Sequence, residues 1–132
     1  SYQAEFDRIS PEIEEYLEYK AEDAEILIIA HGIVARSAMT AVDELRAKGI
    51  KAGLFRPITL RPLAVKPLRA AVSRAKQVLF TESANGQLAQ MVLEKIYGLQ
   101  TPYSTLFKMG VGVTGDDIVQ KVEQMVKTPA TV

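Results

Sequence analysis

Cysteine is absent from this sequence of 132 residues, and histidine occurs once. Without cysteine, the chain can form no disulfide bond, no thiolate zinc site and no cysteine-ligated iron–sulfur cluster. The single histidine, His31, also excludes a metal site built from several imidazoles. No apolar run approaches the roughly 20 residues of a membrane-spanning helix, and the acidic first residues are unlike a signal peptide. We therefore expect a cytoplasmic protein that does not contact membranes.

Charge is balanced over the whole sequence but unevenly distributed along it. The 16 basic and 16 acidic residues cancel. Residues 1–25 hold nine acidic and two basic residues, so this stretch carries −7 and the remainder carries +7. The basic residues of the remainder alternate with acidic ones, and no cluster combines basic with aromatic side chains. Because nucleic-acid surfaces need such clusters, we expect no nucleic-acid partner.

Two hydrophobic patterns alternate along most of the sequence. Apolar, mostly β-branched runs at residues 25–31, 50–55, 77–81 and 103–107 predict strands. After each run, apolar residues recur at helical spacing, which predicts a helix. These stripes are Val34, Ala38, Ala41, Val42 and Leu45; Leu68, Ala71, Val72 and Ala75; Leu88, Val92 and Ile96; and Ile118, Val122, Met125 and Val126. The alternation predicts a three-layer α/β/α domain with a mainly parallel sheet, and right-handed crossovers favour strand order 2-1-3-4.

The first residues do not take part in this alternation. We predict an acidic connector arm at residues 1–23 and the α/β domain at residues 24–132. Ser10, followed by proline, is a suitable N-cap for a helix, and Tyr16 and Leu17 would lie on one face of that helix. We expect the arm to pack on the domain or on a neighbouring chain.

A glycine pattern near the end of the sequence has the spelling of a dinucleotide-binding turn. Residues 110–115 read G-x-G-x-x-G, but only 17 residues follow, too few for a second βαβ unit. Asp116 and Asp117 would also repel a pyrophosphate. Thr114 and Asp117 have the spacing of a capping box, although the acid is usually Glu. We interpret this stretch as a capped helix start that binds no nucleotide.

One group of residues falls where a parallel sheet of this order would bind a ligand. Ligands bind outside the carboxyl ends of the strands, where the crossover direction reverses. A histidine and a glutamate there can transfer protons, and the N–H groups opening the third helix can hold an anion or a partner's carboxylate. A histidine at a strand end, however, more commonly just hydrogen-bonds a neighbouring loop, and Glu82 can pair with it or with a basic residue. We assign no catalytic, cofactor-binding or metal-ligating residue, and take as a candidate loop or interface His31, Gly32, Glu82, Asn85, Gly86 and Gln87.

Three segments carry a resemblance to a known family. Residues 24–38 (AEILIIAHGIVARSA), 53–62 (GLFRPITLRP) and 78–89 (VLFTESANGQLA) resemble the C-terminal part of the alpha subunit of 2-oxoacid:ferredoxin oxidoreductases, the 2-oxoglutarate type most of all. That part is similar to the transketolase C-terminal domain. The block RPITL at residues 56–60 is the most specific signal, followed by the Gly-Gln pair after Glu82.

The resemblance implies a role inside a larger enzyme. Such an assembly oxidatively decarboxylates a 2-oxoacid, here 2-oxoglutarate, with thiamine diphosphate and Mg²⁺, passes electrons through iron–sulfur clusters to ferredoxin, and yields an acyl-CoA. The family binds its cofactors on other domains of the alpha subunit and on the beta subunit. The resemblance therefore implies a fragment that carries no cofactor and that holds those domains and subunits together.

The sequence departs from the family pattern at three positions. The family usually has an aromatic or small residue at position 31, Ser or Thr at position 33, and the loop asparagine one place before Asn85. Two alternatives also fit the predicted fold: the C-terminal domain of a transketolase or of a 2-oxoacid dehydrogenase beta chain, and a free-standing flavodoxin-like binding module. Residues 32–36 make a poor phosphate loop for such a module.

Overall fold

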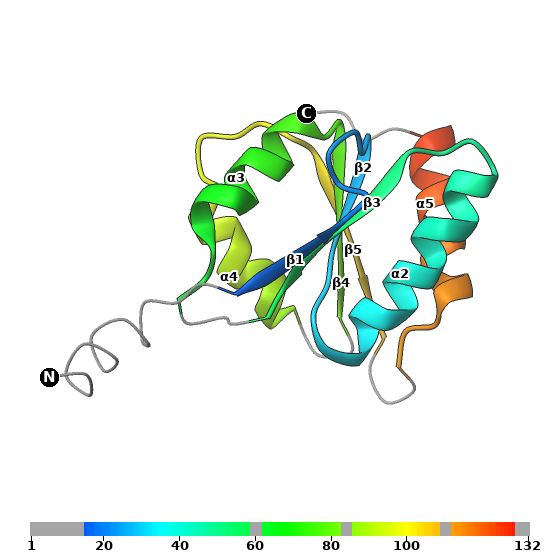
Figure 1. Cartoon of the computed structure of the whole chain (residues 1–132), viewed down its shortest axis with the longest axis horizontal. Coiled ribbons are helices and arrows are strands. Elements are labelled where there is room, and N and C mark those ends of the chain that lie inside the picture. Colours follow the sequence, from blue (N-terminus) through cyan, green and yellow to red (C-terminus); the bar gives the residue numbers. More distant parts are fainter. Residues whose placement is uncertain (1–14, 59–61, 83–85, 109–111, 129–132) are drawn as a thin grey trace, which may run out of the picture.

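The protein is represented by a computed structural model, which describes residues 15–58, 62–82, 86–108 and 112–128. Within these residues, a five-stranded sheet lies between two pairs of helices (Figure 1). The elements are β1 (Tyr16–Tyr19), β2 (Ile26–Ile29), α2 (Gly32–Ala47), β3 (Ala52–Pro57), α3 (Val65–Arg74), β4 (Gln77–Glu82), α4 (Gln87–Lys95), β5 (Tyr103–Phe107) and α5 (Gly115–Lys127).

The sheet has the order β1-β3-β2-β4-β5, in which β2 to β5 are parallel. Without β1, this is the predicted order 2-1-3-4, and the predicted three-layer α/β/α class is confirmed. Helices α2 and α5 cover one face of the sheet, and α3 and α4 cover the other (Figure 1). The central strands β2 and β4 are buried along their whole length, as their unbroken apolar runs require.

The helix predicted around Tyr16 and Leu17 is wrong. These residues form β1, which runs antiparallel to β3 with Tyr16 opposite Pro57. The helix start predicted at Ser10 lies outside the described residues. In Tyr16–Tyr19, side chains alternate between the two faces of the sheet, and the Tyr16 ring stacks on Phe55 at 5.3 Å between centroids. A short helix cannot match the backbone bonds that the β3 edge offers, so tertiary pairing overrides the helical spacing.

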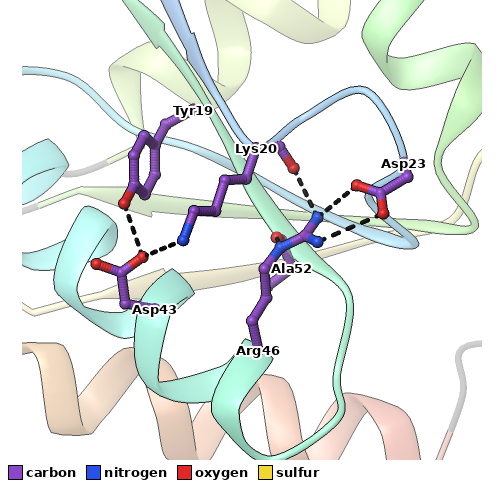
Figure 2. A network of polar contacts seen from close by, with 6 residues as sticks. All are labelled: Tyr19, Lys20, Asp23, Asp43, Arg46 and Ala52. Atoms are coloured by element: carbon purple, nitrogen blue, oxygen red, sulfur yellow. Dashed lines mark hydrogen bonds and ion pairs between the residues drawn. The ribbon is translucent and has the colours of Figure 1, made fainter.

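A polar network fastens the end of β1 to α2 (Figure 2). The Arg46 guanidinium donates to the backbone oxygen of Lys20 at 2.8 Å, to that of Ala52 at 2.7 Å and to the Asp23 carboxylate at 2.7 Å. The Arg46 guanidinium holds the pKa of Asp23 below its ordinary value. One side chain therefore ties together α2, the start of β3 and the turn after β1.

A second carboxylate of the same network receives two donors. The Tyr19 hydroxyl and the Lys20 ammonium both donate to Asp43, at 2.7 and 2.8 Å (Figure 2). The bond from Lys20, followed by that from Tyr19, lowers the pKa of Asp43. The bond to Asp43 in turn raises the pKa of Lys20. Because these groups are exposed, each pair stabilises the fold only slightly. We infer that the network mainly fixes the position of β1 relative to α2.

Gly53 in β3 allows a close approach of backbone to backbone. A Cβ atom at this position would lie 2.8 Å from the Cα of Ala21 and 2.8 Å from the Cβ of Ala24. Real Cβ atoms essentially never come so near a neighbour, so only glycine fits here. The turn after β1 can therefore pack flat against the sheet.

Candidate functional site

The predicted site residues lie at the carboxyl edge of the sheet, meaning the edge at which β2 to β5 end. In the register of β2 and β4, Ile29 lies opposite Phe80. His31 and Glu82 each follow two positions later, so they stand at neighbouring strand ends. Gly86 and Gln87 begin α4 at the same edge. Asn85, another residue of the candidate loop, lies outside the described residues, and the N-cap position of α4 belongs to Gly86.

The Glu82 carboxylate is turned into the protein. Its side chain is buried, with 3% of the residue exposed, and it accepts backbone hydrogen bonds from Leu88 at 2.7 Å and from Ala89 at 3.0 Å. These donors belong to the first turn of α4, where unsatisfied N–H groups and the helix dipole favour a negative charge. Two of the N–H groups that the sequence offers to an external anion therefore bind the protein's own acid.

His31 occupies the N-cap position of α2 with extended backbone, and its side chain makes no capping bond. Gly32 follows with φ +63°, a conformation that glycine adopts without strain. His31 is partly exposed, and within the described residues no hydrogen bond joins it to Glu82. The structure thus places this histidine and this glutamate at one edge without forming a proton-transfer pair.

Apolar side chains that the sequence analysis missed stand exposed at this edge. Ile33, beside His31, is 84% exposed, and Ile58, just after β3, is 51% exposed. Ile33 could have been noticed from the sequence, because it lies off the buried stripe that begins at Val34. Ile58 carried no such signal, since an apolar residue next to a strand is ordinarily expected to be buried. Both isoleucines follow neighbouring strands, β2 and β3, so two exposed apolar side chains lie at the carboxyl edge.

A cavity of about 750 Å³ opens beside the same edge, between α3 and α4. Gln87 lines it together with Leu63, Val65 and Met91, whereas His31 and Glu82 do not. Its size suits a small molecule. Its lining, however, brings no nucleophile next to a base, and no group of three potential metal ligands occurs within the described residues.

The glycine-rich turn leads into α5 as a capped helix. Gly110 lies outside the described residues. The Asp117 backbone N–H donates to the Thr114 hydroxyl at 3.1 Å, and the Thr114 N–H donates to the Asp117 carboxylate at 2.9 Å. The predicted capping box is confirmed. The Thr114 backbone bond, followed by the bond from Lys108, lowers the pKa of Asp117. The negatively charged Asp117 carboxylate therefore occupies the helix start at which a pyrophosphate would have to bind.

Comparison with known proteins identifies the family of this fold. The family model of the pyruvate:ferredoxin oxidoreductase core domain II matches residues 24–124. The chain belongs to this family. The expected family relationship is therefore confirmed.

Within the described residues, no helix has both the length and the apolar character needed to cross a bilayer.

Two curated relatives are named as an oxidoreductase subunit and a synthase subunit. The chain is 44% identical over 75 residues to the ketoisovalerate oxidoreductase subunit VorB of Methanothermobacter marburgensis, a match covering 57% of this chain and 21% of the relative. It is 38% identical over 82 residues to the 2-oxoglutarate synthase subunit KorA of Methanothermobacter thermautotrophicus, covering 62% of this chain and 21% of the relative. The chain thus spans about a fifth of the length of these relatives.

A solved structure shares the fold. The 2-oxoglutarate:ferredoxin oxidoreductase from Magnetococcus marinus, with 2-oxoglutarate, coenzyme A and succinyl-CoA bound, superposes with a TM-score of 0.75 over 91% of this chain. The match covers 21% of that chain at 20% sequence identity. This likeness concerns the fold alone. The relatives' names differ in the 2-oxoacid, so they do not single out the expected 2-oxoglutarate.

Proposed function

We propose that this chain is a non-catalytic assembly domain of a 2-oxoacid:ferredoxin oxidoreductase. In this proposal, the complex oxidatively decarboxylates a 2-oxoacid with thiamine diphosphate and Mg²⁺ and passes the electrons through iron–sulfur clusters to ferredoxin. The product is an acyl-CoA. Membership of the core domain II family and the names of the relatives support the proposal. The proposed substrate is the 2-oxoacid class, and the proposed location is the cytoplasm.

One observation carries the assembly role. At the carboxyl edge, Glu82 is committed to the first turn of α4, while Ile33 and Ile58 are exposed. An edge whose buried acid is satisfied internally offers little to a reaction. Its exposed isoleucines gain free energy when another surface covers them, roughly 1.5–3 kcal/mol for a fully buried large side chain. The partners proposed for this edge are other domains of the alpha subunit and the beta subunit.

The chemistry of the cofactors is assigned to those other parts. Thiamine diphosphate and Mg²⁺ require a diphosphate-binding motif, and iron–sulfur clusters require cysteine thiolates. This sequence contains no cysteine. The proposal therefore gives the segment no cofactor of its own. Its contribution to turnover is the relative position of the domains that hold the cofactors.

The assembled complex provides the test. Ile33→Glu combined with Ile58→Glu in the alpha subunit should reduce the yield of assembled alpha–beta complex, because two charges would be placed in a contact surface. Val126→Glu is the matched control, since Val126 is 45% exposed at the opposite edge. Size-exclusion chromatography measures assembly, and ferredoxin reduction measures kcat for each assembled complex. A normal assembly yield with a much lower kcat would mean that this edge takes part in the chemistry, contrary to the proposal.

A further inference from the structure

β5 forms one edge of the sheet, and within the described residues only β4 pairs with it. Pro102 accepts a backbone bond from the start of β4 at 3.0 Å, and Lys108 donates one to its end at 3.3 Å. Backbone polar groups in a strand point alternately to the two sides. Tyr103, Thr105 and Phe107 therefore direct their N–H and C=O groups away from β4, toward the open side.

The two edges of the sheet differ in how they are protected. Natural edge strands are commonly short, charged or interrupted, which prevents pairing with another chain. β1 fits this description: it has four residues, Glu18 pairs with Arg74 at 3.2 Å, and Lys20, which follows it, has φ +53°. β5 has five residues and no charged one, and Tyr103 and Phe107 are 49% and 38% exposed. β5 thus lacks the protection that β1 has.

A groove continues the open edge across the adjacent face of the sheet. It has a volume of about 520 Å³ and lies between α4 and β5, with Ala89 and Leu93 on the helix side. Phe107 is fixed at one end, because its ring lies against Gly86 so closely that a Cβ there would be 3.2 Å away. At the other end, Tyr103 packs edge-to-face on Phe80 at 5.7 Å. The exposed aromatic rings are therefore held in position before any partner arrives.

We propose that β5 pairs antiparallel with β5 of a second copy of this chain, about a two-fold axis at Thr105. This register places Thr105 opposite the same residue of the second copy, and Tyr103 opposite Phe107 of the second copy. The outward N–H and C=O groups of all three residues then bond across the axis. Threonine–threonine and aromatic–aromatic pairs are among the favourable cross-strand pairs. In a two-fold interface each contact occurs twice, so Tyr103 and Phe107 form two identical aromatic pairs on either side of the Thr105 pair.

The charges near β5 are compatible with self-pairing. Lys108 lies opposite Pro102 of the second copy, and its ammonium is already paired with Asp117 at 3.1 Å. Lys108 therefore meets no like charge from the second copy's β5, and the formal net charge of the chain is zero. Two five-residue strands with the adjoining grooves make an interface below about 1,200 Å², the size of weak complexes. The expected product is a dimer that forms reversibly at high concentration.

Charge replacement at the axis tests the register directly. In sedimentation equilibrium of the chain up to roughly millimolar concentration, Thr105→Lys and Thr105→Glu should each raise the dimer dissociation constant about fivefold, because each variant opposes its own charge. An equimolar mixture of the two variants should recover association. Thr105→Pro removes the outward N–H, which an edge strand tolerates, and should weaken the dimer roughly tenfold. Thr40→Lys is the control, because Thr40 is an exposed threonine of α2, the helix that packs over β3 on the other side of the sheet.

The outcomes separate the possible occupants of the edge. Weaker association of each single variant, recovery in the mixture of Thr105→Lys with Thr105→Glu, and no effect of Thr40→Lys support the proposal. A chain that stays monomeric at every concentration overturns it and leaves the edge to a different polypeptide. A dimer that the Thr105 variants do not change also overturns it, because the contact then lies elsewhere. Circular dichroism of each variant confirms that the monomer fold is retained.

Discussion

At the residue scale, Glu82 shows how a side chain of the same protein can accept the free N–H groups at the start of a helix. Glu82 ends β4, and its carboxylate reaches forward to two N–H groups of α4. Six positions separate it from Leu88, too far for the usual capping patterns within one helix. The strand end and the helix start are therefore joined across the connecting loop. This bond sets the direction in which α4 leaves the sheet.

Replacing this carboxylate should cost stability rather than create an anion site. Glu82→Ala leaves buried N–H groups without an acceptor, and we expect the free energy of unfolding to fall by about 2–3 kcal/mol. Glu82→Gln keeps one acceptor oxygen and should cost less than half of that. Urea denaturation followed by circular dichroism measures both. Equal stabilities of wild type and Glu82→Ala would show that the bonds to Leu88 and Ala89 contribute nothing.

Gly53 gives a second prediction at this scale. Gly53→Ala would drive a methyl group into Ala21 and displace the turn that the Arg46 guanidinium binds, so we expect a fall of about 2–3 kcal/mol in the free energy of unfolding. Gly115→Ala is the matched control, because its Cβ would meet only Ser37 at 3.4 Å. Thermal denaturation compares the two variants. A Gly53→Ala protein as stable as Gly115→Ala would mean that the turn can move aside freely.

At the element scale, β1 and α5 show which elements can be predicted from local sequence patterns and which cannot. α5 was predictable, because its apolar stripe and its capping residues are adjacent in sequence. β1 was not, because nothing local distinguishes its four residues from a helix. What decides between the two is the free edge of β3 and the Phe55 ring, both about 40 positions further along the chain. Local spacing predicts an element only where no distant partner competes.

The capping box of α5 should make stability depend on pH in the acid range. The pKa of Asp117 is lowered from 3.8, so its stabilising effect is complete above that pH and is lost as pH falls through the lower folded value. Asp117→Asn should therefore lower the melting temperature at neutral pH, and the difference from wild type should shrink as the pH falls below 3.8.

Asp116→Asn removes the same charge from the same turn and serves as the control. Scanning calorimetry from pH 7 downward should show a larger loss for Asp117→Asn, because only Asp117 bonds to Thr114 and Lys108. If both variants lose the same amount at every pH, the effect belongs to the helix dipole alone.

At the scale of the whole molecule, periodicity accounted for most of the fold and for little of the site. β2 to β5 and α2 to α5 follow from buried runs and apolar stripes, and right-handed crossovers fix their order. The sequence predicted that His31 and Glu82 lie at the same edge of the sheet, and the structure places them there. The direction of the Glu82 side chain and the exposure of Ile33 depend on packing between distant segments, which spacing along one chain does not encode.

The 132-residue chain should fold without any cofactor. We expect a circular dichroism spectrum of mixed helix and strand, a single cooperative unfolding transition, and no heat of binding with thiamine diphosphate. We also expect no binding of NAD at residues 110–115, because Asp117 already holds the helix start. Isothermal titration calorimetry with each cofactor is the measurement. Saturable thiamine diphosphate binding would place part of the cofactor site on this segment.

The antiparallel direction of β1 has a practical consequence for attaching probes. Because Tyr16 pairs with Pro57 at the end of β3, the described chain enters at the carboxyl edge, beside Ile58. α5 also begins at this edge, where Asp117 bonds to Lys108, and it ends at the opposite edge, where Met125 and Val126 lie against the starts of the strands. A fluorophore near Glu15 would therefore report on the carboxyl edge, and one near Thr128 on the opposite pole. Energy transfer between the two would measure the height of the domain along its strands.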